Sequence, residues 1–213
     1  MLLKWFGHAS FLLKTGELTI YIDPYFEPYT GEKKLPSADV ILISHWHFDH
    51  ATLETIHRIR TDKTVLLGTR EASSEVFGCH TVLPGEKHNV ENVEITIVPA
   101  YSMRRVHHPK GASVGFIISA EGKKLYYASD SDYIPEMVNL TADILIVSVG
   151  GTYTMKPKEA ADAVHTIKPK IAIPMHYGKI EGTSDNAELF KEYVETTPDT
   201  RVIIMKEGEE ITL

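Results

Sequence analysis

The sequence lacks the features of exported and membrane proteins. It has a single cysteine, Cys79, which cannot form a disulfide within the chain, so a disulfide scaffold is excluded and a reducing compartment is expected. We expect Cys79 to pack in a short strand. The chain does not open with a charged segment followed by a long apolar stretch, and no apolar run reaches the roughly 18 residues of a membrane span. These absences predict a cytoplasmic location and no membrane partner.

The sequence also lacks blocks of basic residues. It carries 22 Lys and Arg against 29 Asp and Glu, a formal net charge of -7. Proteins that grip phosphate backbones need clustered positive charge, so no nucleic acid partner is expected. A small-molecule substrate is the expected partner, and the oligomeric state is left open, a homo-oligomer included.

Short apolar runs alternate with turn signals along the whole chain, which predicts many strands and few helices. The order of strands followed by a strand that leads into a helix occurs twice. With 213 residues, one domain spanning 1–213 is expected. Two sheets packed face to face with helices outside, an α+β fold of four αββα layers, is the simplest arrangement. The predicted helices are Leu53–Arg60, Pro157–Ile167 and Asp185–Glu195; the predicted strands are 2–6, 10–13, 19–22, 40–43, 64–67, 93–98, 114–118, 124–127, 144–147, 171–174 and 202–205.

A cluster of metal-ligating residue types follows the apolar run 41–43. Residues two apart in an extended chain point to the same side, so His45 and His47 can reach one ion. Asp49 and His50, at the turn into the next helix, can face a second ion. A lone histidine is more often a surface or core residue. Four ligand-type residues within six positions at a strand end instead indicate a metal site.

Two later strands end in the same chemistry. Asp130 follows the strand at 124–127 and is well placed to put a carboxylate between two ions. The alternatives are that it is an ordinary turn or helix-cap aspartate, or that Asp132 has the bridging role. His176 follows the strand at 171–174 and would complete the second metal site.

The remaining ligand is sought in the loop that contains His107 and His108. We choose His108, because the proline that follows it favours an extended backbone and would help to hold the direction of the side chain. His107 stays the alternative, and either residue could be an ordinary surface-loop histidine.

Residues near the predicted ligands could support the site in two ways. His8 and Asp23 are candidates to hold ligating histidines, since such histidines usually donate their other ring N–H to a carboxylate or carbonyl; Asp23 could equally be a plain turn residue. Arg104, Arg105 and Lys110 could contact an anionic group of the substrate, although solvated loop charges are the commoner case.

The chain closely resembles the metallo-β-lactamase superfamily, whose signature His-x-His-x-Asp-His is matched by His45, His47, Asp49 and His50. The resemblance extends from end to end of the chain. Further segments resemble a branch of predicted metal-dependent hydrolases that is similar to ascorbate 6-phosphate lactonases and, more distantly, to the phospholipase D acting on N-acyl phosphatidylethanolamines. These segments include Gly7-His8-Ala9-Ser10-Phe11, Val149-Gly150-Gly151-Thr152-Tyr153-Thr154-Met155 and Pro174-Met175-His176-Tyr177-Gly178.

The resemblance implies a complete set of ligands for two metal ions. It assigns His45, His47 and His108 to one ion, Asp49, His50 and His176 to the other, and Asp130 to a position between them. The sequence departs from the family pattern at two places. Ser102 stands where many relatives have a histidine, which moves the third ligand to the His107–His108 pair, and Ser129 replaces the usual glycine before the bridging aspartate.

This ligand set predicts hydrolysis by a metal-activated water. Imidazole and carboxylate suit zinc, with manganese or iron as alternatives. Two ions about 3.5 to 4 Å apart can share a water and lower its pKa towards neutrality. Asp49 would both bind one ion and orient or deprotonate the attacking water. The predicted function is a metal-dependent hydrolase of a small ester, lactone or phosphoester; the alternatives are a phosphodiesterase or nuclease of the same superfamily and a non-catalytic metal-binding module.

Overall fold

The computed structural model describes residues 1–25, 35–104, 106–178, 180–196 and 199–213. It contains two compact units, one formed by 1–83 with 206–213 and the other by 84–205. Each unit contains one seven-stranded sheet with both parallel and antiparallel strands. Among the described residues, no helix is long and apolar enough to cross a membrane.

The first unit orders its strands β14-β1-β2-β3-β4-β5-β6. Antiparallel pairing joins β14 to β1, β1 to β2 and β2 to β3, and parallel pairing continues from β3 to β6. Helix α1 follows β4, and α2 follows β5. The bounds are β1 Leu2–Gly7, β2 Ser10–Thr15, β3 Leu18–Ile22, β4 Val40–Ile43, α1 Leu53–Ile59, β5 Val65–Gly68, α2 Arg70–Glu75, β6 Cys79–Thr81 and β14 Glu210–Thr212.

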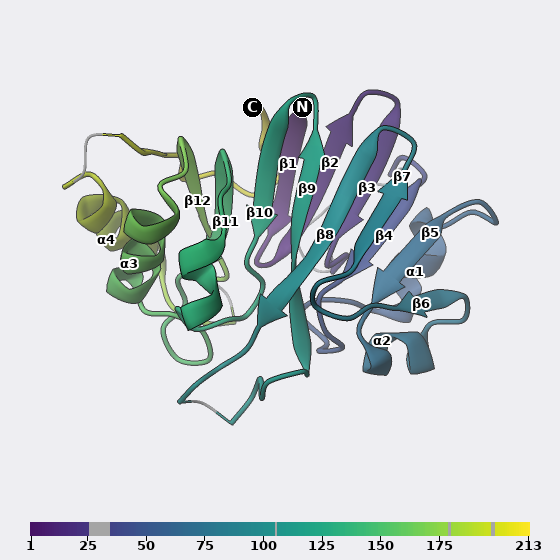
Figure 1. Cartoon of the computed structure of the whole chain (residues 1–213), viewed down its shortest axis with the longest axis horizontal. Coiled ribbons are helices and arrows are strands. Elements are labelled where there is room, and N and C mark those ends of the chain that lie inside the picture. The colour runs from purple at the N-terminus through teal and green to yellow at the C-terminus, as the bar shows by residue number, and fades with distance from the viewer. Residues whose placement is uncertain (26–34, 105, 179, 197–198) are drawn as a thin grey trace. The chain divides into compact units, whose positions relative to one another are not determined.

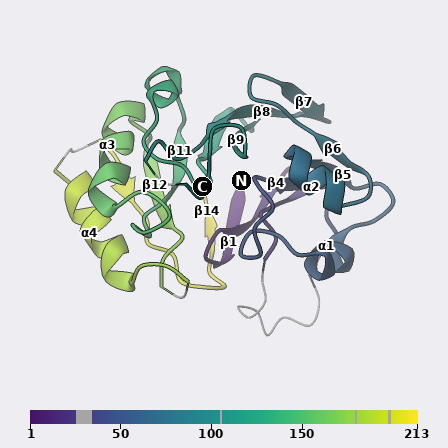
Figure 2. The same cartoon turned by 90° about the horizontal axis from the view of Figure 1, so that it is seen from below.

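Both helices of this unit pack on the same apolar cluster of its sheet. Ile56 of α1 and Ala72 of α2 are fully buried and belong to one cluster with Tyr21, Ile41 and Ile43 of β3 and β4. Burying an isoleucine contributes about 1.5–3 kcal/mol. Figure 2 shows α1 and α2 beside β4 and β5. The two helices therefore cover the parallel part of this sheet.

The second unit repeats this plan with the order β13-β12-β11-β10-β9-β8-β7. Strands β7 to β10 are antiparallel, and β10 to β13 are parallel. Its bounds are β7 Lys87–Val90, β8 Val93–Ala100, β9 Ser113–Ala120, β10 Lys123–Tyr127, the 3-10 helix η1 Pro135–Asn139, β11 Ile144–Ser148, α3 Pro157–Ile167, β12 Ile171–Met175, α4 Ser184–Val194 and β13 Arg201–Val202.

Helices α3 and α4 lie side by side next to β11 and β12 (Figure 1). Val164 of α3 and Phe190 of α4 are fully buried in one cluster with Leu145 and Val147 of β11. Pro157 opens α3 at its first turn, where its missing N–H costs no hydrogen bond. The alternation of buried strand and amphipathic helix therefore produces the parallel half of this sheet.

The parallel strands of each unit deliver the predicted site residues from their carboxyl ends. Asp23 follows β3, and His45 lies two residues beyond the end of β4. In the other unit, Asp130 lies three residues beyond β10, and His176 directly follows β12. The carboxyl ends of parallel strands are the usual location of ligand sites in such sheets.

The elements expected from the sequence are confirmed with small shifts of their ends. β4 and α3 have the predicted bounds, Cys79 begins the short strand β6, and the last predicted strand is shorter, at Arg201–Val202. Not predicted were α2, β7, β14 and η1. Each of these is short, and the two strands are largely polar, so they carry little periodic signal. That 1–213 form one domain stays a prediction.

Gly115 on β9 offers a test of packing in the second sheet. A Cβ at this position would lie 2.9 Å from the carbonyl oxygen of Tyr127 and 3.1 Å from Val98 Cγ2. Gly115→Ala is therefore expected to destabilise the protein by about 1–3 kcal/mol in urea unfolding. Ser119→Ala on the same strand, at a partly exposed position, should change stability by less than about 0.5 kcal/mol. Equal stability of the two variants would contradict this packing.

Candidate metal centre

Asp23 joins the ends of β3 and β4 and holds His50. Its side chain is fully buried. One carboxylate oxygen accepts the Ser44 backbone N–H at 2.7 Å, and the other accepts the Ser44 hydroxyl at 2.5 Å and lies 2.7 Å from His50 Nδ1. Of the two roles considered for Asp23, the structure favours the support of a histidine: its carboxylate orients the His50 ring.

His45, His47 and His50 form a compact cluster of rings after β4. The ring centroids of His45 and His50 are 4.0 Å apart, and those of His45 and His47 are 4.6 Å apart. His45 and His50 are buried, whereas His47 is exposed. Ligand atoms of Asp23, His45 and His50 lie within 4.8 Å of one another. His45 Nδ1 lies 3.0 Å from the Ser44 hydroxyl, which leaves Nε2 as the nitrogen suited to bind a metal.

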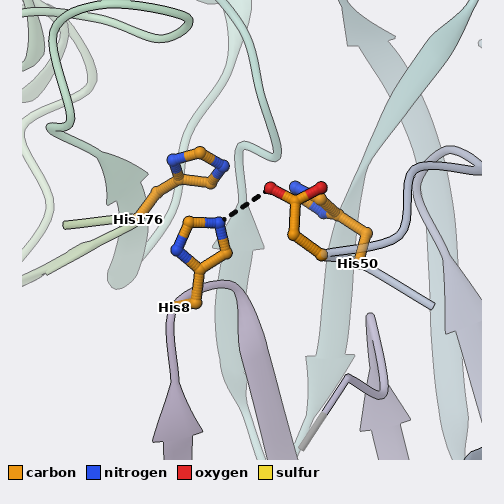
Figure 3. Close-up of side chains that lie close together, drawn as sticks. His8, His50 and His176 are labelled. Carbon is orange, nitrogen blue, oxygen red and sulfur yellow. Dashed lines mark hydrogen bonds and ion pairs between the residues drawn. The ribbon is translucent and has the colours of Figure 1, made fainter. Parts of the chain in front are cut away.

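His8 contacts the predicted catalytic residue. It lies in the turn between β1 and β2 with a φ of +52°, and its side chain is buried. His8 Nε2 is 3.0 Å from Asp49 Oδ2, the contact drawn as the dashed line in Figure 3. The indole N–H of Trp5 donates to the His8 carbonyl at 3.1 Å and so fixes this turn. His8 is therefore placed to orient the Asp49 carboxylate.

In the second unit, two histidines converge on one carboxylate oxygen. His176 Nε2 lies 3.0 Å and His108 Nε2 lies 3.6 Å from Asp130 Oδ2, and all three side chains are at most 3% exposed. The preceding residue, Ser129, has a φ of +56°, which explains why a glycine is usual there. An oxygen that faces two imidazole nitrogens has the surroundings that a bridging ligand requires.

The alternatives for two of these ligands have other contacts. His107 is exposed, and its ring meets the ring of Tyr153 edge-on at 4.9 Å. Asp132 Oδ2 accepts the backbone N–H of Met103 at 2.8 Å, so this carboxylate holds the start of the loop that contains His108. The Ser102 N–H donates to the His108 carbonyl at 2.7 Å within the same loop. The assignment of ligands remains a prediction, and this geometry favours His108 and Asp130.

The basic residues predicted near an anionic group are exposed where the structure describes them. Lys110 Nζ lies 2.9 Å from the Glu136 carboxylate and 4.9 Å from the centre of the Tyr101 ring. Arg104 is exposed, and Arg105 lies outside the described residues. Because Lys110 already has an anionic partner, these contacts give no support to a role for it in substrate binding.

Glu181 is a site residue that the sequence did not predict. Its Oε2 lies 2.8 Å from His176 Nδ1, and Oε1 accepts the backbone N–H groups of Thr152, Tyr153 and Thr154. Burial alone would raise the pKa of Glu181, but the hydrogen bond and charge of His176 and the backbone N–H groups of Tyr153 and Thr154 lower it. The one signal in the sequence was a carboxylate next to a glycine shortly after His176, which is too weak to predict this role.

The described side chains fit a divalent metal ion. Neutral imidazoles and carboxylates are the ligands of zinc, and of manganese or iron. His50 Nδ1 and His176 Nδ1 lie 2.7 Å and 2.8 Å from the oxygen of a buried carboxylate, which leaves Nε2 as their ligand nitrogen. The metal-ligand sets that combine residues of both units remain predictions from the sequence.

Comparison with known proteins gives the family. A family model described as "Beta-lactamase superfamily domain" matches residues 2–176. Two relatives named UPF0173 metal-dependent hydrolase, from Staphylothermus marinus and Pyrobaculum islandicum, are 32% and 30% identical; the alignments cover 99% and 100% of this chain and 98% and 100% of theirs. The chain therefore belongs to the metallo-β-lactamase superfamily, as the signature predicted.

A solved structure confirms the predicted fold class. A protein from Parabacteroides distasonis, provisionally assigned as a metal-dependent hydrolase, is 28% identical and superimposes with a TM-score of 0.85 over 97% of this chain and 93% of that one. The two mixed sheets with their helices are thus those of the metallo-β-lactamase fold. The similarity to ascorbate 6-phosphate lactonases stays a prediction.

Asp23→Asn tests whether the Asp23 carboxylate supports metal binding. The amide would turn an N–H₂ donor towards either Ser44 or His50 Nδ1, where the carboxylate accepts. Zinc affinity, measured by competition with a chromogenic chelator, is expected to fall about 10- to 100-fold. Asp39→Asn is the matched control, since Asp39 accepts the Thr19 N–H at 2.8 Å in an exposed position. Unchanged affinity in Asp23→Asn would refute the role.

Alanine variants of His107 and His108 separate the two candidate ligands. His108→Ala is expected to lower the metal content of the purified protein, because its buried Nε2 is lost from beside Asp130. His107→Ala should keep the wild-type metal content, since this ring is exposed. Elemental analysis of both proteins provides the measurement, and the opposite pattern would assign the ligand to His107.

Proposed function

We propose that this chain hydrolyses a small ester, lactone or phosphoester with a water activated at a two-metal site. The proposed ligands are His45, His47 and His108 for one ion, Asp49, His50 and His176 for the other, and Asp130 between them. Zinc is the proposed metal, with manganese or iron as alternatives. The chain is a metal-dependent hydrolase by class. It belongs to the metallo-β-lactamase superfamily, and relatives that align with nearly its whole length are named metal-dependent hydrolases.

The observation that carries the proposal is the convergence of His108 and His176 on one oxygen of Asp130. Two imidazole nitrogens lie within 3.6 Å of a single oxygen of this buried carboxylate, and a buried carboxylate is costly unless a positive charge or N–H donors compensate it. Divalent ions held by Asp130 together with His108 and His176 would supply such a charge. The cluster of Asp23, His45 and His50 gives independent support from the first unit.

Divalent ions bound by these ligands would lower the pKa of a bound water and polarise the bond to be cleaved. Asp49 would accept the proton of the attacking water and pass it to the leaving group. His8, 3.0 Å from Asp49 Oδ2, would hold the carboxylate in the orientation needed for this transfer. Asp23 and Glu181 would keep His50 and His176 in place during the reaction.

A small substrate fits the charge of the chain better than a nucleic acid does. The net charge of -7 opposes binding of a polyanion, and the described basic side chains near His108 are exposed or paired with a carboxylate. A cytoplasmic location and a small-molecule partner are part of the proposal. A phosphodiesterase and a non-catalytic metal-binding module remain as outcomes of the test.

Removal of metal and substitution of Asp49 test the proposal together. The metal-free protein should not hydrolyse a panel of lactones, acyl esters and a generic phosphodiester, and addition of zinc or manganese should restore turnover. Asp49→Asn should lower kcat about 10²- to 10⁴-fold, because the amide cannot accept the proton. Initial rates for each substrate give the measurement.

Asp62→Asn, an exposed substitution of the same kind, serves as the control and should keep wild-type rates. Full activity without metal would refute the mechanism. Turnover of the phosphodiester alone would favour the phosphodiesterase, and metal binding without turnover of any substrate would favour the non-catalytic module.

A further inference from the structure

His176 is held between two carboxylates in an uncommon backbone conformation. It directly follows β12 with a φ of +61°, a left-handed conformation that is unfavourable for a residue other than glycine. Its Nε2 lies 3.0 Å from Asp130 Oδ2, and its Nδ1 lies 2.8 Å from Glu181 Oε2. The ring is 1% exposed and lies between these two carboxylates.

The Glu181 carboxylate is itself held by donors on the loop after β11. Its side chain has no exposed surface. Oε1 accepts three successive backbone N–H groups, those of Thr152, Tyr153 and Thr154, and Oε2 accepts the Thr154 hydroxyl at 3.1 Å. A run of backbone N–H groups that points at one oxygen forms a fixed anion-binding nest. Glu181 therefore occupies this nest as a carboxylate.

The glycines around this nest make room for the carboxylate. A Cβ on Gly150 would overlap the Cδ atom of Glu181. Gly182 has a φ of +62°, and a Cβ there would lie 2.9 Å from the Gly150 carbonyl oxygen. Asn186 of α4 donates to the carbonyl oxygens of Val149 and Gly150 at 2.9 and 3.1 Å. The two glycines and Asn186 thus shape a buried space that fits the Glu181 side chain.

We propose that Glu181 is a positioning residue that keeps a proton on His176 Nδ1 and so presents Nε2 as the metal-binding nitrogen. The proposal rests on the proposed function in one respect, the assignment of His176 as a metal ligand. Glu181 acts through His176 and does not contact substrate or metal. Because Oε1 is committed to three N–H donors, Oε2 is the oxygen that faces the ring, and it can only accept.

Glu181→Gln separates this role from simple packing, because it keeps the shape of the side chain. The glutamine oxygen must stay in the nest, since an N–H₂ group there would face three N–H donors. Its N–H₂ group would then face His176 Nδ1 and require that nitrogen to accept a hydrogen bond. The ring proton would move to Nε2, and the nitrogen assigned to the metal would be blocked.

The test is ¹⁵N NMR of the histidine rings in the full-length metal-free protein, with His176 assigned from a His176→Gln variant. Wild type is expected to carry a proton on Nδ1, and Glu181→Gln is expected to have lost it. Zinc affinity, measured by chelator competition, should fall about 10- to 100-fold in Glu181→Gln. Glu159→Gln is the matched control, because Glu159 accepts the Lys156 N–H at 3.0 Å at the start of α3; both readouts should stay as in wild type.

A wild-type Nδ1 without a proton would overturn the proposal, and so would an unchanged zinc affinity in a Glu181→Gln protein that has lost the Nδ1 proton. If Glu181→Gln does not fold, the wild-type spectrum still decides, since a protonated Nδ1 supports the proposal and an unprotonated one refutes it. Neither readout involves a substrate. A wild-type protein without hydrolytic activity would therefore refute the proposed function and leave this inference intact.

Discussion

The structure depends on buried carboxylates that hold histidines at the ends of parallel strands. Asp23 does so for His50 in the first unit, and Glu181 does so for His176 in the second. In each case the side chain of the carboxylate has no exposed surface, and its second oxygen accepts backbone N–H groups, one for Asp23 and three for Glu181. A buried carboxylate without such donors would cost several kcal/mol, so each unit must supply them before the histidine can be placed.

The local backbone shows the cost of this arrangement. His8, Asp23, Ser129 and His176 all have φ between +45° and +61° although none is a glycine. Each such conformation costs about 1–3 kcal/mol and persists only where surrounding contacts determine it. The apolar clusters under α1 and α2 and under α3 and α4 provide the stability that tolerates this strain. In each unit, the packing of the helices on the sheet therefore supports the strained backbone at the ends of its own strands.

The sequence predicted those features that depend on residues close together in the chain. The cluster His45 to His50 was recognisable because its members are contiguous and follow an apolar strand, and Asp130 and His176 because each follows another such strand. The contact between His8 and Asp49 joins residues 41 positions apart, and no periodic pattern in the sequence predicts it. Glu181 could not be identified because its role arises from the nest at 152–154, which exists only once β11 and the following loop are folded. The short elements α2, β7 and β14 were missed for the related reason that tertiary pairing, not local pattern, defines them.

The carboxylates differ in their exposure to solvent, and this difference separates their roles where the residue type alone does not. The side chains of Asp23 and Glu181 are fully enclosed, and both oxygens of each face donors, so these groups are suited to orienting histidines and not to exchanging protons. The Asp49 side chain is 11% exposed, and the neighbour that orients it is an imidazole. A group that takes a proton from a water molecule must be reachable by that water, and Asp49 meets this requirement where Asp23 and Glu181 do not. Burial thus separates the carboxylates that hold histidines from the one proposed to react with water.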